Sequence, residues 1–111
     1  MILELVTFPT PDGVTRDKEY EGARHSAALW VKNSELVAKH FLRDDAGGSG
    51  AAYIWPSVEA AKRSHDAAWL ADFKKRMGCE PDIRYFELMM TADARGGQVI
   101  EYGEPLGQAA Q

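Results

Sequence analysis

Residues 1–92 are expected to fold as one α+β domain of the ferredoxin-like type, with an antiparallel sheet and a C-terminal tail, 93–111. Three observations predict this class. Segments rich in β-branched and aromatic residues alternate with helix-periodic segments in the order β-α-β-β-α-β. The length, 111 residues, suffices for one hydrophobic core but not for two. A single cysteine and a formal charge of −4 exclude a disulfide scaffold and a basic nucleic-acid surface.

The first β-α unit is predicted by a change of periodicity. Residues 2–8 are β-rich and alternate imperfectly, and the segment 9–13 after them, with two prolines and a glycine, is typical of a turn. Beyond it, Thr15 or Asp17 offers a helix N-cap. The apolar residues that follow fall mostly on one stripe of a helix, which is expected to run until Asn33.

The remaining strands are predicted from short β-compatible segments. Residues 36–43 and 51–55 are of this kind, and the Asp- and Gly-rich stretch 44–50 between them predicts a long turn, so that the two form a hairpin. A strongly β-forming stretch covers residues 83–90. In the tail only residues 98–102 are a strand candidate, and a weak one.

The helical segment between the hairpin and the last long strand is expected to be interrupted. Ser57 offers an N-cap, and the periodicity that follows it breaks at residues 64–66. Asp66 can cap a second piece, for which Gly78 provides the C-terminal stop. The sequence therefore predicts either one kinked helix or two consecutive helices.

A monomer of this fold would expose apolar side chains on the sheet face that the helices leave bare. Alternation along the strand 36–43 places on one face Leu36, Ala38, His40 and Leu42. The opposite face of this strand and both faces of the strand 83–90 also carry apolar residues. Since both helices cover the same face, we expect a homodimer whose sheets pack face to face.

Several stretches of the second half together resemble one family. They are Ser49–Ser57 (SGAAYIWPS), Glu59–Ala61, Trp69 and Glu80–Glu87 (EPDIRYFE). In them the chain resembles the dimeric α/β-barrel superfamily, and more narrowly the YdhR-type monooxygenases, relatives of the antibiotic-biosynthesis monooxygenases. The resemblance covers about residues 35–87. It implies a homodimer of ferredoxin-like protomers, each with a small-molecule pocket between sheet and helices, and oxygenation of a small aromatic or polyketide-like substrate without flavin, haem or metal.

Cofactor-free oxygenation needs a base, hydrogen-bond donors for a substrate anion and an apolar cavity. His40 and His65 are the candidate catalytic bases, since His40 lies on a strand face and His65 at the break of the second helix. Both also fit a structural role, His40 in the core or an interface and His65 at a solvated helix end. His25 is expected at the surface. The candidate substrate-binding residues are large aromatic side chains: Trp30, Tyr53, Trp55, Trp69 and Tyr85.

Two other functions would use the same pocket, namely binding of a small molecule without turnover and an isomerase- or cyclase-like reaction. No metal or haem is expected, because the sequence has no HExxH motif and no histidine pair at i, i+4. No apolar run approaches the ~20 residues that cross a bilayer. We therefore expect a cytoplasmic homodimer that takes a small apolar or aromatic ligand, with neither a membrane nor a nucleic acid as partner.

Overall fold

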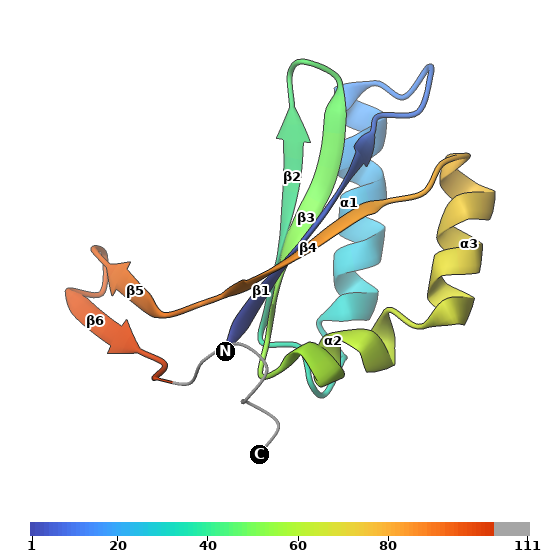
Figure 1. The fold of residues 1–111 in the computed structure, drawn as a ribbon. Helices are drawn as coiled ribbons and strands as arrows, with labels where there is room; N and C mark the ends of the chain where they lie inside the picture. Colours follow the sequence, from blue (N-terminus) through green and yellow to red (C-terminus); the bar gives the residue numbers. More distant parts are fainter. Residues whose placement is uncertain (104–111) are drawn as a thin grey trace.

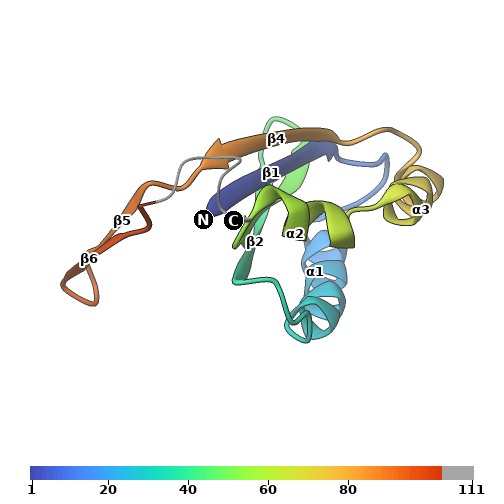
Figure 2. The ribbon, with the colours of Figure 1, turned by 60° about the horizontal axis from the view of Figure 1, so that its bottom comes forward.

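The computed structural model describes residues 1–103 and shows an α+β fold in which a four-stranded sheet carries the helices on one face (Figure 1, Figure 2). In chain order the elements are β1 (Ile2–Pro9), α1 (Arg16–Trp30), β2 (Ala38–Asp44), β3 (Gly48–Trp55), α2 (Val58–Ser64), α3 (Ala67–Met77), β4 (Asp82–Glu87), β5 (Met90–Asp93) and β6 (Gln98–Glu101). The main sheet has the order β2-β3-β1-β4, and each neighbouring pair is antiparallel. The predicted α+β class is thus confirmed, and the arrangement is compatible with a ferredoxin-like fold.

β1 lies in the middle of the sheet because both of its edges are paired, one with β3 and the other with β4. Successive side chains of a strand point to opposite faces. Ile2, Glu4 and Val6 therefore share the face toward the helices, where they are only 0–2% exposed. Leu3 and Leu5 lie on the opposite face and are partly exposed. The two faces of the sheet thus differ sharply in burial.

The hydrophobic core fills the space between the sheet and the helices. Its buried members are Ile2, Val6, Ala51, Tyr53, Trp55, Ala60 and Ala61. Helix α1 reaches this core with Trp30, whose ring centroid lies 5.3 Å from that of Tyr53. Helix α3 reaches β1 with Phe73, which meets the Phe8 ring edge-on at 4.9 Å. Aromatic contacts of this kind join the two layers.

The helix boundaries follow local capping signals. Thr15 caps α1, Ser57 caps α2 and Asp66 caps α3, each accepting a hydrogen bond from a backbone N–H of the first turn. Helix α3 ends at Met77, and the C-cap residue Gly78 follows with a φ of 74°, the left-handed conformation that favours glycine. The predicted break between two consecutive helices is therefore confirmed. Across residues 1–103 no helix combines the length and the apolar character needed to cross a membrane.

The predicted long turn over residues 44–50 is wrong, because β3 already begins at Gly48. Only residues 45–47 form the turn. The glycine-rich sequence indicates a loop, but Gly48 and Gly50 lie in β3, an inner strand of the sheet. A Cβ atom on Gly50 would collide with the backbone carbonyl oxygen of Val6, so the close approach of β1 and β3 requires glycine.

The predicted strand 83–90 is too long, since β4 ends at Glu87. The register pairs Glu87 with Ile2, the first residue of β1, so β4 has no further partner in the sheet. The chain continues into β5, which pairs only with β6 in a separate two-stranded ribbon that projects from the body (Figure 1, Figure 2). β6 occupies the position of the strand candidate 98–102. The rest of the predicted tail, 104–111, lies outside the described residues.

The close approach at Gly50 generates a stability prediction. We expect Gly50→Ala to lower the free energy of unfolding by about 1–3 kcal/mol, because the strands must move apart to admit a methyl group. Urea denaturation followed by circular dichroism measures this. Gly22→Ala is the matched control, since a Cβ there meets nothing within 4 Å and helix α1 gains by up to about 1 kcal/mol. Equal effects of the two substitutions would contradict the steric argument.

Candidate functional site

A carboxylate lies at the centre of the sheet, beneath the helices. The Glu4 side chain is 0% exposed. The indole Nε1–H of Trp55 donates a hydrogen bond to it at 2.9 Å, and Nδ1 of His65 lies 2.9 Å from a carboxylate oxygen. Burial of a charge without partners costs several kcal/mol. These two contacts are therefore what allows Glu4 to occupy a core position.

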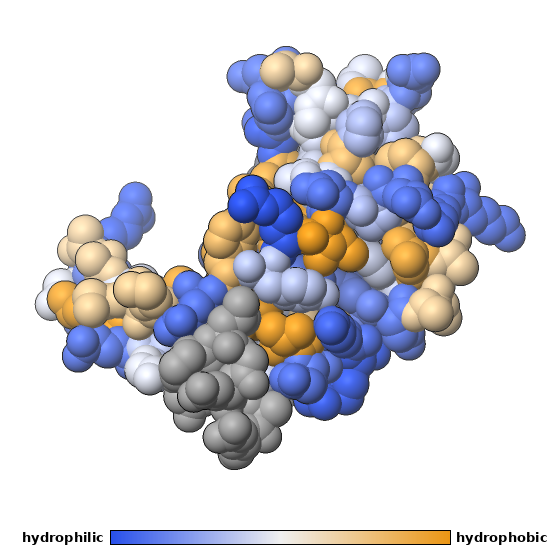
Figure 3. Space-filling view, viewed as in Figure 1, coloured by the Kyte–Doolittle hydropathy of each residue, from blue (hydrophilic) through white to orange (hydrophobic). Residues whose placement is uncertain are grey.

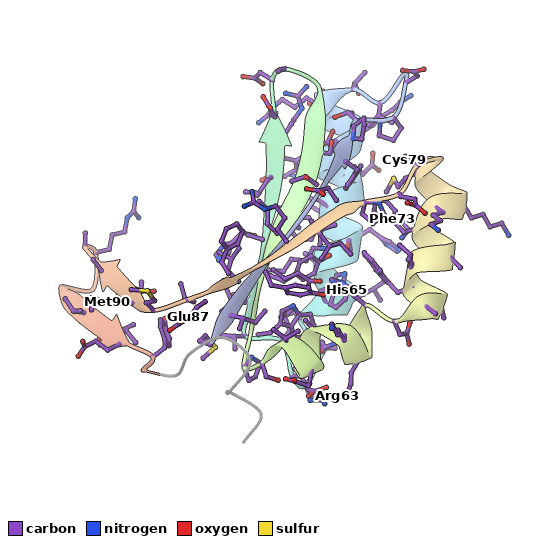
Figure 4. The ribbon with its side chains drawn as sticks, in the orientation of Figure 1. Arg63, His65, Phe73, Cys79, Glu87 and Met90 are labelled. Carbon is purple, nitrogen blue, oxygen red and sulfur yellow. The ribbon has the colours of Figure 1, made fainter. Side chains whose placement is uncertain are left out.

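His65 lies at the break between α2 and α3 (Figure 4). From there its imidazole contacts the Glu4 carboxylate. Its backbone N–H caps α2 by donating to the Ala61 carbonyl at 2.8 Å, and its imidazole is 1% exposed. An ionised carboxylate only accepts hydrogen bonds, so Nδ1 carries the hydrogen. The other ring nitrogen, Nε2, is buried and has no hydrogen-bond partner among the described residues. This is the arrangement in which a carboxylate orients a histidine base.

Four aromatic rings surround the imidazole, and the Trp55 ring is the most distant of them, at 5.9 Å. Trp69 from α3 stacks on it, with ring centroids 3.9 Å apart. Tyr53 from β3 meets it edge-on at 4.5 Å, and Trp30 from α1 does so at 5.4 Å. The histidine environment is therefore apolar except at the bond to Glu4.

A cavity of about 770 Å³ adjoins these rings, between α1, α3 and the strands β1, β2 and β3. Its aromatic wall consists of Tyr20, Trp30, Phe41, Tyr53, Trp69 and Phe73, together with Phe8. Glu4, Trp55 and His65 are not part of the wall. Trp30, Tyr53 and Trp69 thus contact the imidazole and also face the cavity, so that only one layer of rings separates the two.

The structure brings most of the predicted site residues together, with His40 as the exception. Trp30, Tyr53, Trp55 and Trp69 surround His65, all with ring centroids within 6 Å of it. Tyr85 lies opposite Glu4 on the neighbouring strand β4. His40 is exposed and pairs with Ala52, on the sheet face that the helices do not cover. His25, expected at the surface, is exposed on α1.

The two tyrosines beside Glu4 hold their protons firmly. Register places Tyr53 and Tyr85 on either side of Glu4, on the same face. Burial, followed by the negative charge of Glu4, raises the pKa of Tyr53 far above its usual range. The same two causes raise the pKa of Tyr85. Both phenols are therefore neutral hydrogen-bond donors at physiological pH.

Two polar residues of this region were not identified from the sequence as site residues. Glu4 had a usable signal, because it occupies a buried position of an alternating strand between Ile2 and Val6. The signal for Lys39 is weaker: it lies two positions before Phe41 on β2, so the two side chains share a face of the strand. Only the register shows that Lys39, Tyr53 and Glu4 lie in one row across the sheet.

The arrangement is suited to removing a proton from a small molecule. It supplies an oriented imidazole, neutral phenols as donors and an apolar cavity, which are the elements of general base catalysis. Within residues 1–103 no cluster of three His, Cys, Asp or Glu side chains has the geometry to hold a metal ion. The side chains gathered here, an imidazole, a carboxylate and two phenols, supply acid–base chemistry.

Removal of the buried carboxylate generates the prediction for this site. We expect Glu4→Ala to lower the free energy of unfolding by about 3–5 kcal/mol, because Trp55 Nε1–H and His65 Nδ1–H lose their acceptor in the interior. Thermal and urea denaturation measure the loss. Glu35→Ala is the control, because it removes an ion pair with Arg63 at the surface and should leave the melting temperature nearly unchanged. A small effect at Glu4 would show that it is not a structural centre.

Comparison of the chain with protein-family models, with curated proteins and with solved structures finds no match. The resemblance to the YdhR-type monooxygenases therefore remains an expectation based on sequence motifs. A function has to be argued from the geometry of Glu4, His65 and the adjoining cavity.

Proposed function

We propose that the protein is a cofactor-independent monooxygenase that oxidises a small aromatic or polyketide-like molecule in the cavity between sheet and helices. The observation that carries the proposal is the buried Glu4–His65 pair, which leaves the basic Nε2 of His65 without a partner beside an aromatic cavity. A buried polar atom without a partner is uncommon in proteins and calls for a functional explanation.

In this mechanism His65 takes a proton from an acidic C–H or O–H group of the substrate. Glu4 stabilises the imidazolium that forms, as carboxylates do for histidine bases elsewhere. Tyr53, whose phenol keeps its proton, can donate a hydrogen bond to the substrate anion. Because Trp30, Tyr53 and Trp69 lie between the imidazole and the cavity, one of these rings has to move for Nε2 to meet the substrate.

The resulting anion is electron-rich enough to react with dioxygen directly. A methylene carbon loses two hydrogens and gains one oxygen atom, forming a ketone. The O–O bond breaks, and the second oxygen atom leaves as water with both hydrogens. The reaction balances without an external reductant.

We further propose a homodimer, the dimeric α/β barrel, formed through the uncovered sheet face. This face carries Leu3, Leu5 and Ile54 near its middle and Leu42 and Phe86 toward its edges. Leu42 is 43% exposed and Phe86 is 38% exposed. Figure 3 shows apolar groups on this side, interrupted by hydrophilic ones. Apolar surface of this kind favours association with a second copy.

The oxygenase hypothesis predicts that His65→Asn abolishes turnover. Asparagine can still donate to Glu4 from the place of Nδ1 but has no atom in the place of Nε2. We expect at least a 100-fold loss of dioxygen uptake, measured with an electrode and anthrone, an aromatic ketone with an acidic methylene group. His25→Asn is the control, since His25 is exposed on α1, and it should retain full activity.

Incubation under nitrogen distinguishes the alternatives. Consumption of anthrone without dioxygen would contradict the oxygenase proposal and identify an isomerase- or cyclase-like enzyme. Binding of anthrone without consumption in air would identify a non-catalytic binding protein. Circular dichroism of His65→Asn checks that a loss of activity does not reflect unfolding.

We predict that the dimer dissociates when a substitution introduces a charge on the uncovered sheet face. We expect the wild-type protein to sediment as a dimer at micromolar concentration and Phe86→Asp to sediment as a monomer, because the carboxylate would be buried at the interface. Val31→Asp is the control, at a position 81% exposed just after α1, and should remain dimeric. A wild-type monomer in sedimentation velocity would refute this assembly.

A further inference from the structure

The cavity has a cationic side chain set into its aromatic wall. The ammonium nitrogen of Lys39 lies 4.1 Å from the ring centroid of Phe41, 4.8 Å from that of Tyr53 and 5.1 Å from that of Trp30. Its nearest polar partner is the hydroxyl oxygen of Ser26, at 3.4 Å. Lys39 is half-buried, and in residues 1–103 it forms no salt bridge.

The charge of the cavity wall is opposite in sign to that of the protein. The chain carries −4, yet the basic residues of the wall are Arg16, Lys18, Arg24, Lys39, Arg43 and Arg76. In the part of the chain that the structure describes, Glu19 is the one acidic side chain of this wall. Arg43 and Arg76 already pair with Asp45 and Asp72. Arg16 and Arg24 lie over the exposed ring of Tyr20, whereas Lys39 lies among the rings of Trp30, Phe41 and Tyr53.

Lys39 is also poorly solvated. Burial, and then the positive charge of Arg76, lowers the pKa of Lys39 to about 8. At neutral pH the group is still mostly protonated, and among residues 1–103 its charge is stabilised by ring faces and one hydroxyl group. A negatively charged ligand group would replace the missing counter-ion, and the apolar surroundings would strengthen that pair.

We propose that the cavity binds aromatic carboxylates, with the ligand carboxylate paired to the Lys39 ammonium group and the ligand ring against Trp30, Tyr53 and Trp69. The inference rests on the proposed function in one respect, that this cavity is the substrate site. It deepens that proposal by naming the chemical class of the substrate.

The position of Lys39 would also orient the ligand toward the base. Lys39 and Glu4 occupy the same cross-strand row, with Tyr53 between them. Neighbours in such a row lie about 5 Å apart. A carboxylate held at Lys39 would therefore direct the ligand ring across Tyr53 toward Trp69 and His65. Lys39 is in this role a substrate-positioning residue that binds a part of the substrate remote from the reacting carbon.

Two ligands that differ mainly in charge test this inference. Isothermal titration calorimetry at pH 7 compares 2-naphthoate with 2-naphthamide, which has the same ring system and no charge. We expect the wild-type protein to bind 2-naphthoate at least tenfold more tightly. Equal affinities for the two ligands, or tighter binding of the amide, would overturn the proposal.

Substitution of Lys39 identifies the residue responsible. Lys39→Met keeps the aliphatic stem, removes the desolvated charge and should fold at least as stably as the wild type. It is expected to lose the preference for 2-naphthoate while keeping its affinity for 2-naphthamide. Lys32→Met is the control, because Lys32 is exposed and outside the cavity, and its preference should be unchanged. A preference that survives in Lys39→Met would contradict the assignment.

The pH dependence of ligand affinity distinguishes a direct role of Lys39 in binding from a merely structural role. Naphthoate stays ionised above pH 6, so a change at higher pH reports on the protein. The titratable or charged groups near Lys39 are Tyr53, whose pKa is raised out of this range, and the Arg76 guanidinium, which does not titrate. Affinity for 2-naphthoate should fall by up to about tenfold per pH unit above pH 8, and affinity for 2-naphthamide should not. An affinity for 2-naphthoate that does not change above pH 8 would contradict the pairing of the ligand carboxylate with Lys39.

The outcome is separable from that of the oxygenase test. Binding of naphthoate needs neither dioxygen nor His65. If anthrone is not oxidised but the preference for naphthoate depends on Lys39, only the oxygenase proposal fails. If anthrone is oxidised and naphthoate shows no preference, only the present inference fails.

Discussion

The buried carboxylate of Glu4 is the constraint around which the rest of the molecule is arranged. It lies on the central strand, where no water can solvate it, so its two hydrogen-bond partners have to come from other elements. Trp55 supplies one from the end of β3, and His65 supplies the other from the break between two helices. The position of the helix break, the register of β1 with β3 and the orientation of the imidazole are consequently coupled to one another.

The same constraint explains why polar groups occur in a row through an otherwise apolar layer. Lys39, Tyr53, Glu4 and Tyr85 follow one another across the sheet, while the next row consists of Phe41, Ala51, Val6 and Ile83. Each polar member is stabilised by a neighbour or by an aromatic face, because burial without a partner is costly. The row connects the oriented histidine at its centre to the cationic end of the cavity.

Local signals in the sequence were sufficient for the order of the elements up to β4, and long-range contacts decided the rest. The caps at Thr15, Ser57 and Asp66 depend on neighbouring residues only, and the helix N-termini they predict agree with the structure. The first helix was expected to run until Asn33 but ends at Trp30. The glycines near Gly50 predict a turn, and this is wrong. Glycine is required at position 50 by the backbone of Val6, which is far away in the chain. Likewise, the aromatic residues of the site were identifiable as large side chains, whereas their gathering around His65 depends on the register and helix packing.

The central place of β1 also has a consequence for biosynthesis. β1 precedes its partners in the chain, and Ile2 pairs with Trp55 on one side and with Glu87 on the other. A ribosome therefore releases the most apolar strand long before either neighbour exists. Until β4 has emerged, the nascent chain must carry this strand with an unsatisfied edge, which favours pairing with other chains. Pairing of β1 with β3 does not need β4, but completion of the sheet has to wait until β4 has been synthesised.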